Sequence, residues 1–246
     1  MNSLTAIFLM LLAVPSLHAE TLVFESPETP VSLAELYSSE GCSSCPPADA
    51  WMSKLKTSPD LWKGFVPVAF HVDYWDNLGW KDPFASREFT NRQRRYTTAW
   101  RTFTVYTPGV VLNGREWRNW SGQKVPPADS AKVGRLKVTL KDRSRADVVF
   151  VPAGEGSKPA KVELALLGGD LDSDVKRGEN GGRKLHHDFV ALHIASADLA
   201  ESGSGFGASI PLPDRTASPP VALAAWVIGG DAQPPIQATG GWLKPR

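Results

Sequence analysis

Cysteine is scarce in this 246-residue chain, and an excess of either charge is absent. The chain has 27 basic and 26 acidic residues, so its formal net charge is +1. A chain this close to neutrality lacks the strong positive field that attracts nucleic acid or anionic membranes. After residue 19 no apolar run is long enough to span a bilayer, so we expect no stable membrane insertion. With 42% hydrophobic residues the composition is that of a globular protein.

The first 19 residues are typical of an export signal. Residues 6–14 form an apolar run that is too short to span a membrane, Pro15 interrupts it, and Ala19 is a small residue suited to cleavage. A buried N-terminal helix is the alternative. We expect cleavage near Ala19 and a periplasmic or secreted location, where a disulfide can persist.

The two cysteines, Cys42 and Cys45, are only three positions apart in the sequence CSSC. A disulfide between them would close almost no loop, so it would stabilise the fold little, and this favours a chemical role. A zinc site needs about four ligands, and the chain has no second cysteine pair. No ligand spacing relates the CSSC motif to the available histidines, which are His71, His186, His187 and His193. We therefore expect no metal and no cofactor, while an inert structural disulfide stays open as an alternative.

Hydrophobic periodicity predicts two differently built halves. The first half alternates between strands and helices, in the order strand 31–38, CSSC, helix 48–55, strand 66–72, helix 86–100, strand 105–112 with an Asn113–Gly114 turn, and helix 127–140. Such alternation is typical of an α/β domain with a central mixed sheet flanked by helices. Beyond residue 142 short apolar runs alternate with turn residues, which predicts a β-rich, sandwich-like domain. We expect a domain at 20–142 and another at 143–246.

The CSSC motif falls at a predicted strand-to-helix junction. A helix N-terminus carries partial positive charge, so a thiolate there is stabilised and nucleophilic near neutral pH. We expect Cys42 to be the exposed, attacking thiol and Cys45 to resolve the mixed disulfide from a deeper position. Glu35 lies in the preceding strand. It either sits beneath Cys45 and transfers protons, or is an ordinary solvent-facing or hydrogen-bonded glutamate.

Thr107–Pro108 follows at the start of a later predicted strand. In thioredoxin-like folds a cis-proline begins the strand that faces the CxxC motif, and the residue before it pairs with substrate backbone. The same order here predicts a cis bond near the cysteines, against the alternative of an ordinary trans bond. Trp75, Trp80 and Tyr106 are candidate substrate contacts, although the two tryptophans equally suit a loop packed by its own aromatics.

Five segments together resemble a secreted bacterial family known as domain of unknown function 1223. They are ELYSSEGCSSCPPAD, FHVDYWDNLGWKDPF, NRQRRY, VYTPGVVLNG and RGENGGR. The resemblance implies a thioredoxin-like N-terminal half and a β-rich C-terminal extension. The matching positions are Cys42, Cys45, Pro46, Pro47, Trp75, Trp80, Asp82, Arg92, Gln93, Tyr96, Thr107, Pro108, Gly114, Gly178, Glu179, Asn180 and Arg183. Whether residues 178–183 face the cysteines or only shape a turn is open.

These observations predict a periplasmic thiol–disulfide oxidoreductase in which Cys42 attacks, Cys45 resolves, and Thr107 with Pro108 positions the substrate. Its partners would be protein or small-molecule thiols and disulfides. The alternative is a non-enzymatic binding protein in which the Cys42–Cys45 disulfide is passive. The sequence indicates neither the direction of the redox chemistry nor the oligomeric state.

Overall fold

The computed structural model describes residues 21–142, 144–154, 159–214, 216, 218–230 and 234–243. The expected signal peptide, residues 1–19, lies outside the described residues. Within the described part of the chain, no helix is both long and apolar enough to cross a membrane.

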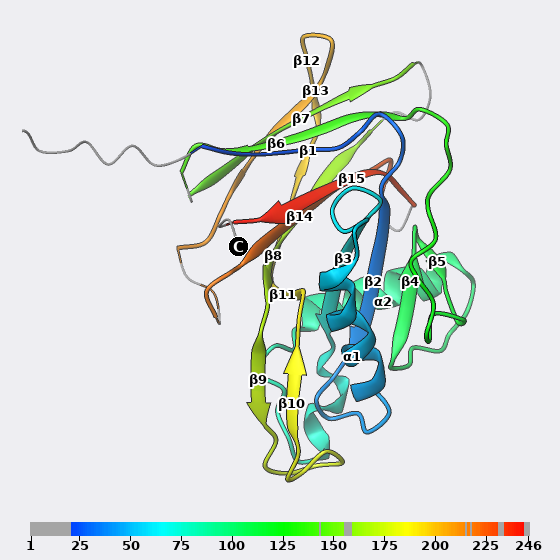
Figure 1. Ribbon diagram of the computed structural model, residues 1–246, viewed down its shortest axis with the longest axis vertical. Coiled ribbons are helices and arrows are strands. Elements are labelled where there is room, and N and C mark those ends of the chain that lie inside the picture. The colour runs from blue at the N-terminus through cyan, green and yellow to red at the C-terminus, as the bar shows by residue number, and fades with distance from the viewer. Residues whose placement is uncertain are drawn as a thin grey trace, which may run out of the picture.

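An eight-stranded sheet forms the centre of the molecule (Figure 1). In spatial order its strands are β15 (Pro235–Trp242), β14 (Ala222–Ile228), β8 (Lys161–Gly168), β11 (Val190–Asp198), β3 (Phe65–His71), β2 (Ser32–Ser38), β4 (Gly109–Leu112) and β5 (Arg115–Glu116). A five-stranded sheet consists of β1 (Leu22–Glu25), β6 (Gly134–Leu140), β7 (Arg145–Pro152), β13 (Gly205–Pro211) and β12 (Ala200–Ser202). A two-stranded ribbon, β9 (Leu171–Asp174) and β10 (Lys184–His187), extends from the lower end in Figure 1.

Helix α1 (Pro46–Lys54) and helix α2 (Arg87–Ala99) pack against the N-terminal strands. Every residue of β2 and β3 is buried, as expected for strands that are covered on both faces. Helix α2 begins at the predicted cap, because the Ser86 side chain accepts a hydrogen bond from the Glu88 backbone N–H. The short 3₁₀ helices η1 (Leu55–Thr57) and η2 (Asp73–Leu78) connect these elements.

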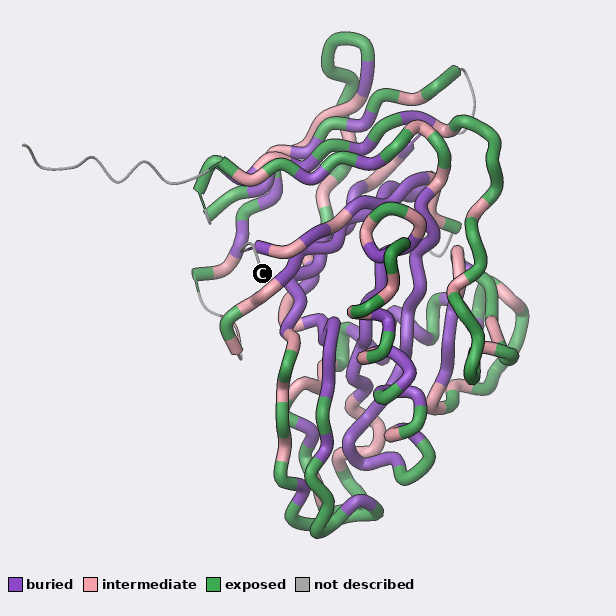
Figure 2. The backbone as a smooth tube through the Cα atoms, viewed as in Figure 1, coloured by how far each residue is buried: buried purple, intermediate pink, exposed green. Residues whose placement is uncertain are grey.

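Two hydrophobic clusters make up the core. One lies between the helices and the large sheet, and the other lies between the two large sheets. Alternate residues of β8 contribute to each cluster, Leu167 to the first and Leu166 to the second, since successive side chains of a strand point to opposite faces. The buried backbone runs through the middle of the large sheet, while its edge strand β5 is exposed (Figure 2).

The expected α/β, thioredoxin-like domain followed by a separate β sandwich is wrong. Strands make up 43% of the structure and helices 15%, so the fold is β-rich. The physical reason is a pairing that joins the two halves: β11 runs parallel to β3, with Val190 opposite Ala69. Strands from both sides of residue 142 thereby share one sheet. Residue 142 itself lies between β6 and β7, which are antiparallel neighbours. A domain division there stays a prediction.

The helix predicted at 127–140 is also wrong, because its second half is strand β6. Leu136, Val138 and Leu140 are buried while their neighbours Arg135 and Lys137 are exposed. This two-residue period is that of a strand with one buried face, and it outweighs the weaker helical spacing. The later apolar runs form strands as predicted, in β7, β8, β11 and β14.

Candidate dithiol site

The CSSC motif lies in the turn between β2 and α1, as the sequence predicted. The Cys42 backbone N–H donates to Ser39 O at 3.1 Å and the Cys45 N–H donates to Cys42 O at 3.2 Å, so the motif itself forms a tight turn. Cys45 occupies the N-cap position of α1, and two prolines follow, which the first helical turn tolerates. The cysteines are free thiols and not a disulfide.

Both cysteines are buried. Cys42 is 1% exposed and Cys45 is 0% exposed, so the expectation that Cys42 is the accessible thiol is wrong for this conformation. Cys45 is the more buried of the two, as the sequence predicted. The difference in exposure is too small for a reagent to reach Cys42 and not Cys45. Any reaction of Cys42 with a partner therefore requires a movement of the groups that cover it.

A loop at residues 178–183, between β9 and β10, lies against the motif. Asn180 is fully buried, and its Nδ2 donates to the backbone oxygens of Glu40 and Cys42, each at 2.9 Å. Glu179 Oε2 accepts a hydrogen bond from the Ser43 backbone N–H at 2.9 Å. Arg183 Nη1 donates to Asn180 Oδ1 at 2.7 Å and fixes the amide orientation. Of the two alternatives that the sequence left open, the loop therefore faces the cysteines.

The two thiols have opposite electrostatic settings. A hydrogen bond from Cys45 is the largest influence on Cys42, and with help from Ser44 and Thr107 it outweighs burial and lowers the pKa of Cys42 to about 6. The Ser44 hydroxyl oxygen lies 3.3 Å from the Cys42 sulfur. Burial, followed by the neighbouring Cys42 thiolate, raises the pKa of Cys45. At neutral pH the pair thus holds a thiolate at Cys42 and a thiol at Cys45.

Thr107 and Trp75 border the same site. The Thr107–Pro108 peptide bond is cis, as predicted. The Thr107 side chain acts to lower the pKa of both thiols, which agrees with the predicted position beside the cysteines. Trp75 Nε1 donates to Thr107 Oγ1 at 2.8 Å, so the indole holds the hydroxyl in place.

No described hydrogen bond joins the side chain of Trp80 or Tyr106 to a cysteine. Trp80 Nε1 donates to Glu40 Oε2 at 2.7 Å, beneath the loop at 178–183. Tyr106 donates its hydroxyl hydrogen to Glu116 and lines a pocket of about 460 Å³ beside Tyr37 and Trp100. No residue of the CSSC motif lines that pocket.

Glu35 belongs to a different buried network. Its carboxylate accepts hydrogen bonds from Arg92 Nε at 2.7 Å and from the Tyr96 hydroxyl at 2.6 Å. Arg92 also donates to Glu163 at 2.6 Å. Among the described hydrogen bonds and ion pairs, none joins Glu35 to a cysteine. The acidic group that acts on Cys45 is Asp49, whose charge contributes to raising the pKa of that thiol.

Sequence reasoning missed a buried polar cluster next to the motif. Its members are Ser38, Glu40, Asp49, His71, Asp82 and His187. Burial raises the pKa of Asp49. Burial alone would lower the pKa of His71, but the charge and hydrogen bond of Asp82 raise it to about 9. No spacing pattern in the sequence could have grouped residues from such distant positions.

Comparison with known protein families identifies the family of this chain. A family model described as protein of unknown function DUF1223 matches residues 33–228. The chain belongs to this family. The matched range includes the cysteines and the loop at 178–183. No curated protein matches the DUF1223 chain.

Two solved structures resemble this DUF1223 protein. Protein AGR_C_4864 from Agrobacterium tumefaciens shares 24% sequence identity, with a TM-score of 0.60 over 87% of this chain and 95% of that one. HBP35 of Porphyromonas gingivalis shares 13% identity, with a TM-score of 0.56 over 88% of this chain and 76% of that one. At these identities the likeness concerns the fold alone.

Proposed function

We propose that this DUF1223 protein carries out thiol–disulfide exchange through Cys42 and Cys45. The observation that supports the proposal is the pairing of two unlinked thiols at the start of α1, where Cys45 lowers the pKa of Cys42. The hydroxyls of Ser44 and Thr107 also stabilise negative charge on Cys42. Because the thiolate is the nucleophile, a thiol with a pKa of about 6 is reactive at neutral pH.

The exchange proceeds in two displacements. The Cys42 thiolate attacks one sulfur of a substrate disulfide, a bond forms between these sulfurs, and the other substrate sulfur leaves as a thiolate. Cys45 then gives up its proton to that departing thiolate and attacks Cys42, which releases the second substrate sulfur. The protein ends with a Cys42–Cys45 disulfide and the substrate with two reduced sulfurs. The reverse sequence oxidises a substrate dithiol.

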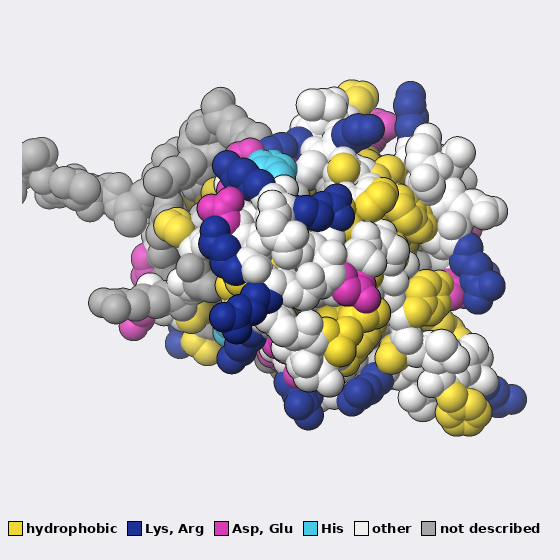
Figure 3. All heavy atoms as spheres, turned by 90° about the horizontal axis from the view of Figure 1, so that it is seen from below, with side chains coloured by type: hydrophobic (Ala, Val, Ile, Leu, Met, Phe, Trp, Pro, Cys, Tyr) yellow, Lys and Arg dark blue, Asp and Glu magenta, His cyan; other side chains and the backbone are white. Residues whose placement is uncertain are grey.

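Opening of the loop at 178–183 belongs to this proposal, since both sulfurs are buried. The surface at this end suits a protein partner, because hydrophobic patches lie among Lys and Arg side chains (Figure 3). Leu78, which is 48% exposed, lies next to Gly178 of the loop. With export after cleavage near Ala19, the partners would be periplasmic or secreted proteins, or small disulfides.

Mixed-disulfide trapping tests the function. A Cys45→Ser variant should retain partner proteins or glutathione on Cys42 in non-reducing gels, because the resolving thiol is gone. The matched Cys42→Ser variant should retain none. The reduction potential of the wild-type pair should lie above about −300 mV, the range of resistant structural disulfides. A lower potential together with no trapping would refute the exchange function and favour a binding protein with a passive disulfide.

A further inference from the structure

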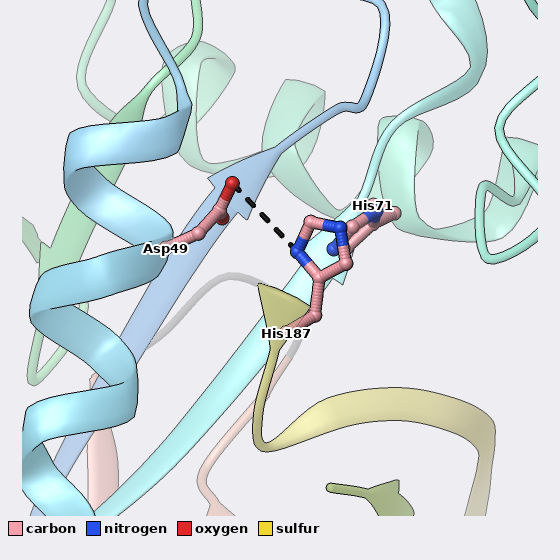
Figure 4. Close-up of side chains that lie close together, drawn as sticks. All are labelled: Asp49, His71 and His187. Atoms are coloured by element: carbon pink, nitrogen blue, oxygen red, sulfur yellow. Dashed lines mark ion pairs between the residues drawn. The ribbon is translucent and has the colours of Figure 1, made fainter. Parts of the chain in front are cut away.

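Three buried side chains behind α1 direct one free polar atom each toward a common point (Figure 4). Asp49 comes from the first turn of α1, His71 from the end of β3, and His187 from the end of β10. One donor atom from each lies within 4.8 Å of the other two, and His187 Nδ1 is 3.7 Å from Asp49 Oδ2. The side chains are 5%, 0% and 1% exposed, respectively.

The three facing atoms are the ones without hydrogen-bond partners. Asp49 Oδ2, His71 Nε2 and His187 Nδ1 are all buried and unpaired by hydrogen bonds. A buried polar atom without a partner costs free energy, on the order of 1–3 kcal/mol each. The three atoms lie within 4.8 Å of one another, so a single bound ion would satisfy them together.

The other polar atom of each of the three side chains has a hydrogen-bond partner. His71 Nδ1 lies 2.7 Å from an Asp82 oxygen, and His187 Nε2 lies 3.2 Å from a Glu40 oxygen. The Ser38 hydroxyl donates to Asp49 Oδ1 at 2.7 Å. A histidine that binds a metal through one nitrogen usually donates the other N–H to a carboxylate, which fixes its tautomer. Both histidines have this arrangement, and with a metal bound it would direct the lone pairs of His71 Nε2 and His187 Nδ1 to the common point.

We propose that Asp49, His71 and His187 bind one divalent transition-metal ion of the zinc type. Two imidazoles and a carboxylate suit zinc, cobalt or ferrous iron, whereas magnesium and calcium prefer oxygen ligands. With bonds of about 2.05 Å and tetrahedral angles, the ligand atoms would lie about 3.4 Å apart. The distance of 3.7 Å between Asp49 Oδ2 and His187 Nδ1 is already near that value, and the distances to His71 Nε2, which are within 4.8 Å, would shorten on binding. Three protein ligands leave a further position for water or another ligand.

A second group of acidic residues and a histidine differs from the proposed metal site, because a lysine already contacts it. Asp170, His186 and Asp188 also lie close together, but the Lys56 ammonium lies 2.6 Å from Asp170 and 2.9 Å from Asp188. His186 is bonded at both ring nitrogens, to Asp172 and Asp188. The Lys56 ammonium already supplies a positive charge to this group, so His186 serves as the control residue for the metal-binding experiment.

Cobalt titration of the full chain tests the proposal. The protein carries Cys42→Ser and Cys45→Ser, so thiols cannot bind the metal, and it is first stripped with a chelator. We expect one equivalent of Co²⁺ with visible d–d bands, displaced by one equivalent of Zn²⁺. Asp49→Asn, which keeps the size of the side chain and an oxygen for Ser38, should weaken binding at least about tenfold. His187→Gln should do the same, and His186→Ala should leave binding unchanged.

Three results would overturn the metal site. They are no stoichiometric binding of Co²⁺ or Zn²⁺ to the cysteine-free chain, binding that Asp49→Asn leaves intact, and binding that His186→Ala abolishes. Circular dichroism of each variant separates loss of ligand from loss of fold. The cysteine-free chain cannot exchange disulfides, so this experiment and the trapping experiment succeed or fail independently.

Discussion

Replacing Asn180 with alanine tests whether the loop at 178–183 controls access to Cys42. The amide donates to the backbone oxygens of Glu40 and Cys42 and accepts from Arg183. Alanine removes all three hydrogen bonds. In the closed conformation it leaves the Glu40 carbonyl oxygen at a buried position without its donor and takes one of two donors from the Cys42 oxygen, whereas in an open conformation water hydrates both oxygens. The substitution therefore destabilises the closed conformation relative to the open one.

The size of the effect follows from the Glu40 carbonyl, because the Cys42 carbonyl keeps the Cys45 N–H as a donor. A buried unsatisfied group costs about 1–3 kcal/mol, so the lower bound is about 1 kcal/mol. Because each 1.4 kcal/mol is a factor of ten, the open population should rise at least about fivefold. If Cys42 reacts only from the open conformation, its alkylation rate by iodoacetamide should rise by the same factor. The assay is pseudo-first-order labelling of the reduced protein at fixed pH, with mass spectrometry to assign the label.

Glu179→Gln is the matched control, since Glu179 is exposed and the glutamine oxygen can still accept from Ser43. It should change the labelling rate little. Equal rates for Asn180→Ala and wild type, with both proteins folded, would refute the reasoning. Cys42 would then be reached by another route, and the loop would have only a structural role.

Three further predictions concern the thiol, the buried ion pair and the chain division. The alkylation rate of Cys42 should fall as pH drops through about 6, because protonation removes the reactive thiolate. An inflection near 8.5, about the value of a free thiol, would contradict this. Arg92→Met should lower the free energy of unfolding in urea by about 3–5 kcal/mol, because Glu35 and Glu163 lose a buried partner. A loss below about 1 kcal/mol, as for a surface pair, would contradict it. Limited proteolysis should cut near residues 142–145 or in 170–184 before the N-terminal elements, and uniform resistance would argue against a division.

Local patterns were enough to predict several elements. Strands β2 and β3, helix α1 and the capped helix α2 each follow from short-range periodicity and from turn or cap residues. The pairing of β3 with β11 could not be predicted in this way. It joins residues more than 100 positions apart and depends on how whole surfaces pack, which a local pattern does not encode. The fold class was wrong for that reason.

The candidate site was predictable where it is local. The cysteines, Thr107 and Pro108 belong to recognisable sequence motifs. No motif shows which face of its strand Glu35 lies on. Glu35 hydrogen-bonds to Arg92 on α2, whereas Ser38, three residues later, hydrogen-bonds to Asp49 on α1. Residues an odd number apart in a strand face opposite ways, so Glu35 faces away from Asp49. Assigning that face requires knowing where both helices pack.

The β9–β10 ribbon explains why a short motif does not define this site. Its loop supplies Asn180 to the backbone of Glu40 and Cys42, and its second strand ends at His187, whose imidazole contacts the Glu40 carboxylate. Glu40 therefore contacts the ribbon through both its backbone and its side chain, two residues before Cys42. A displacement of the ribbon large enough to expose the thiols must break the Asn180 contacts first. His187 lies at the end of β10 away from this loop, so the loop can move at the Lys184 end while His187 stays buried.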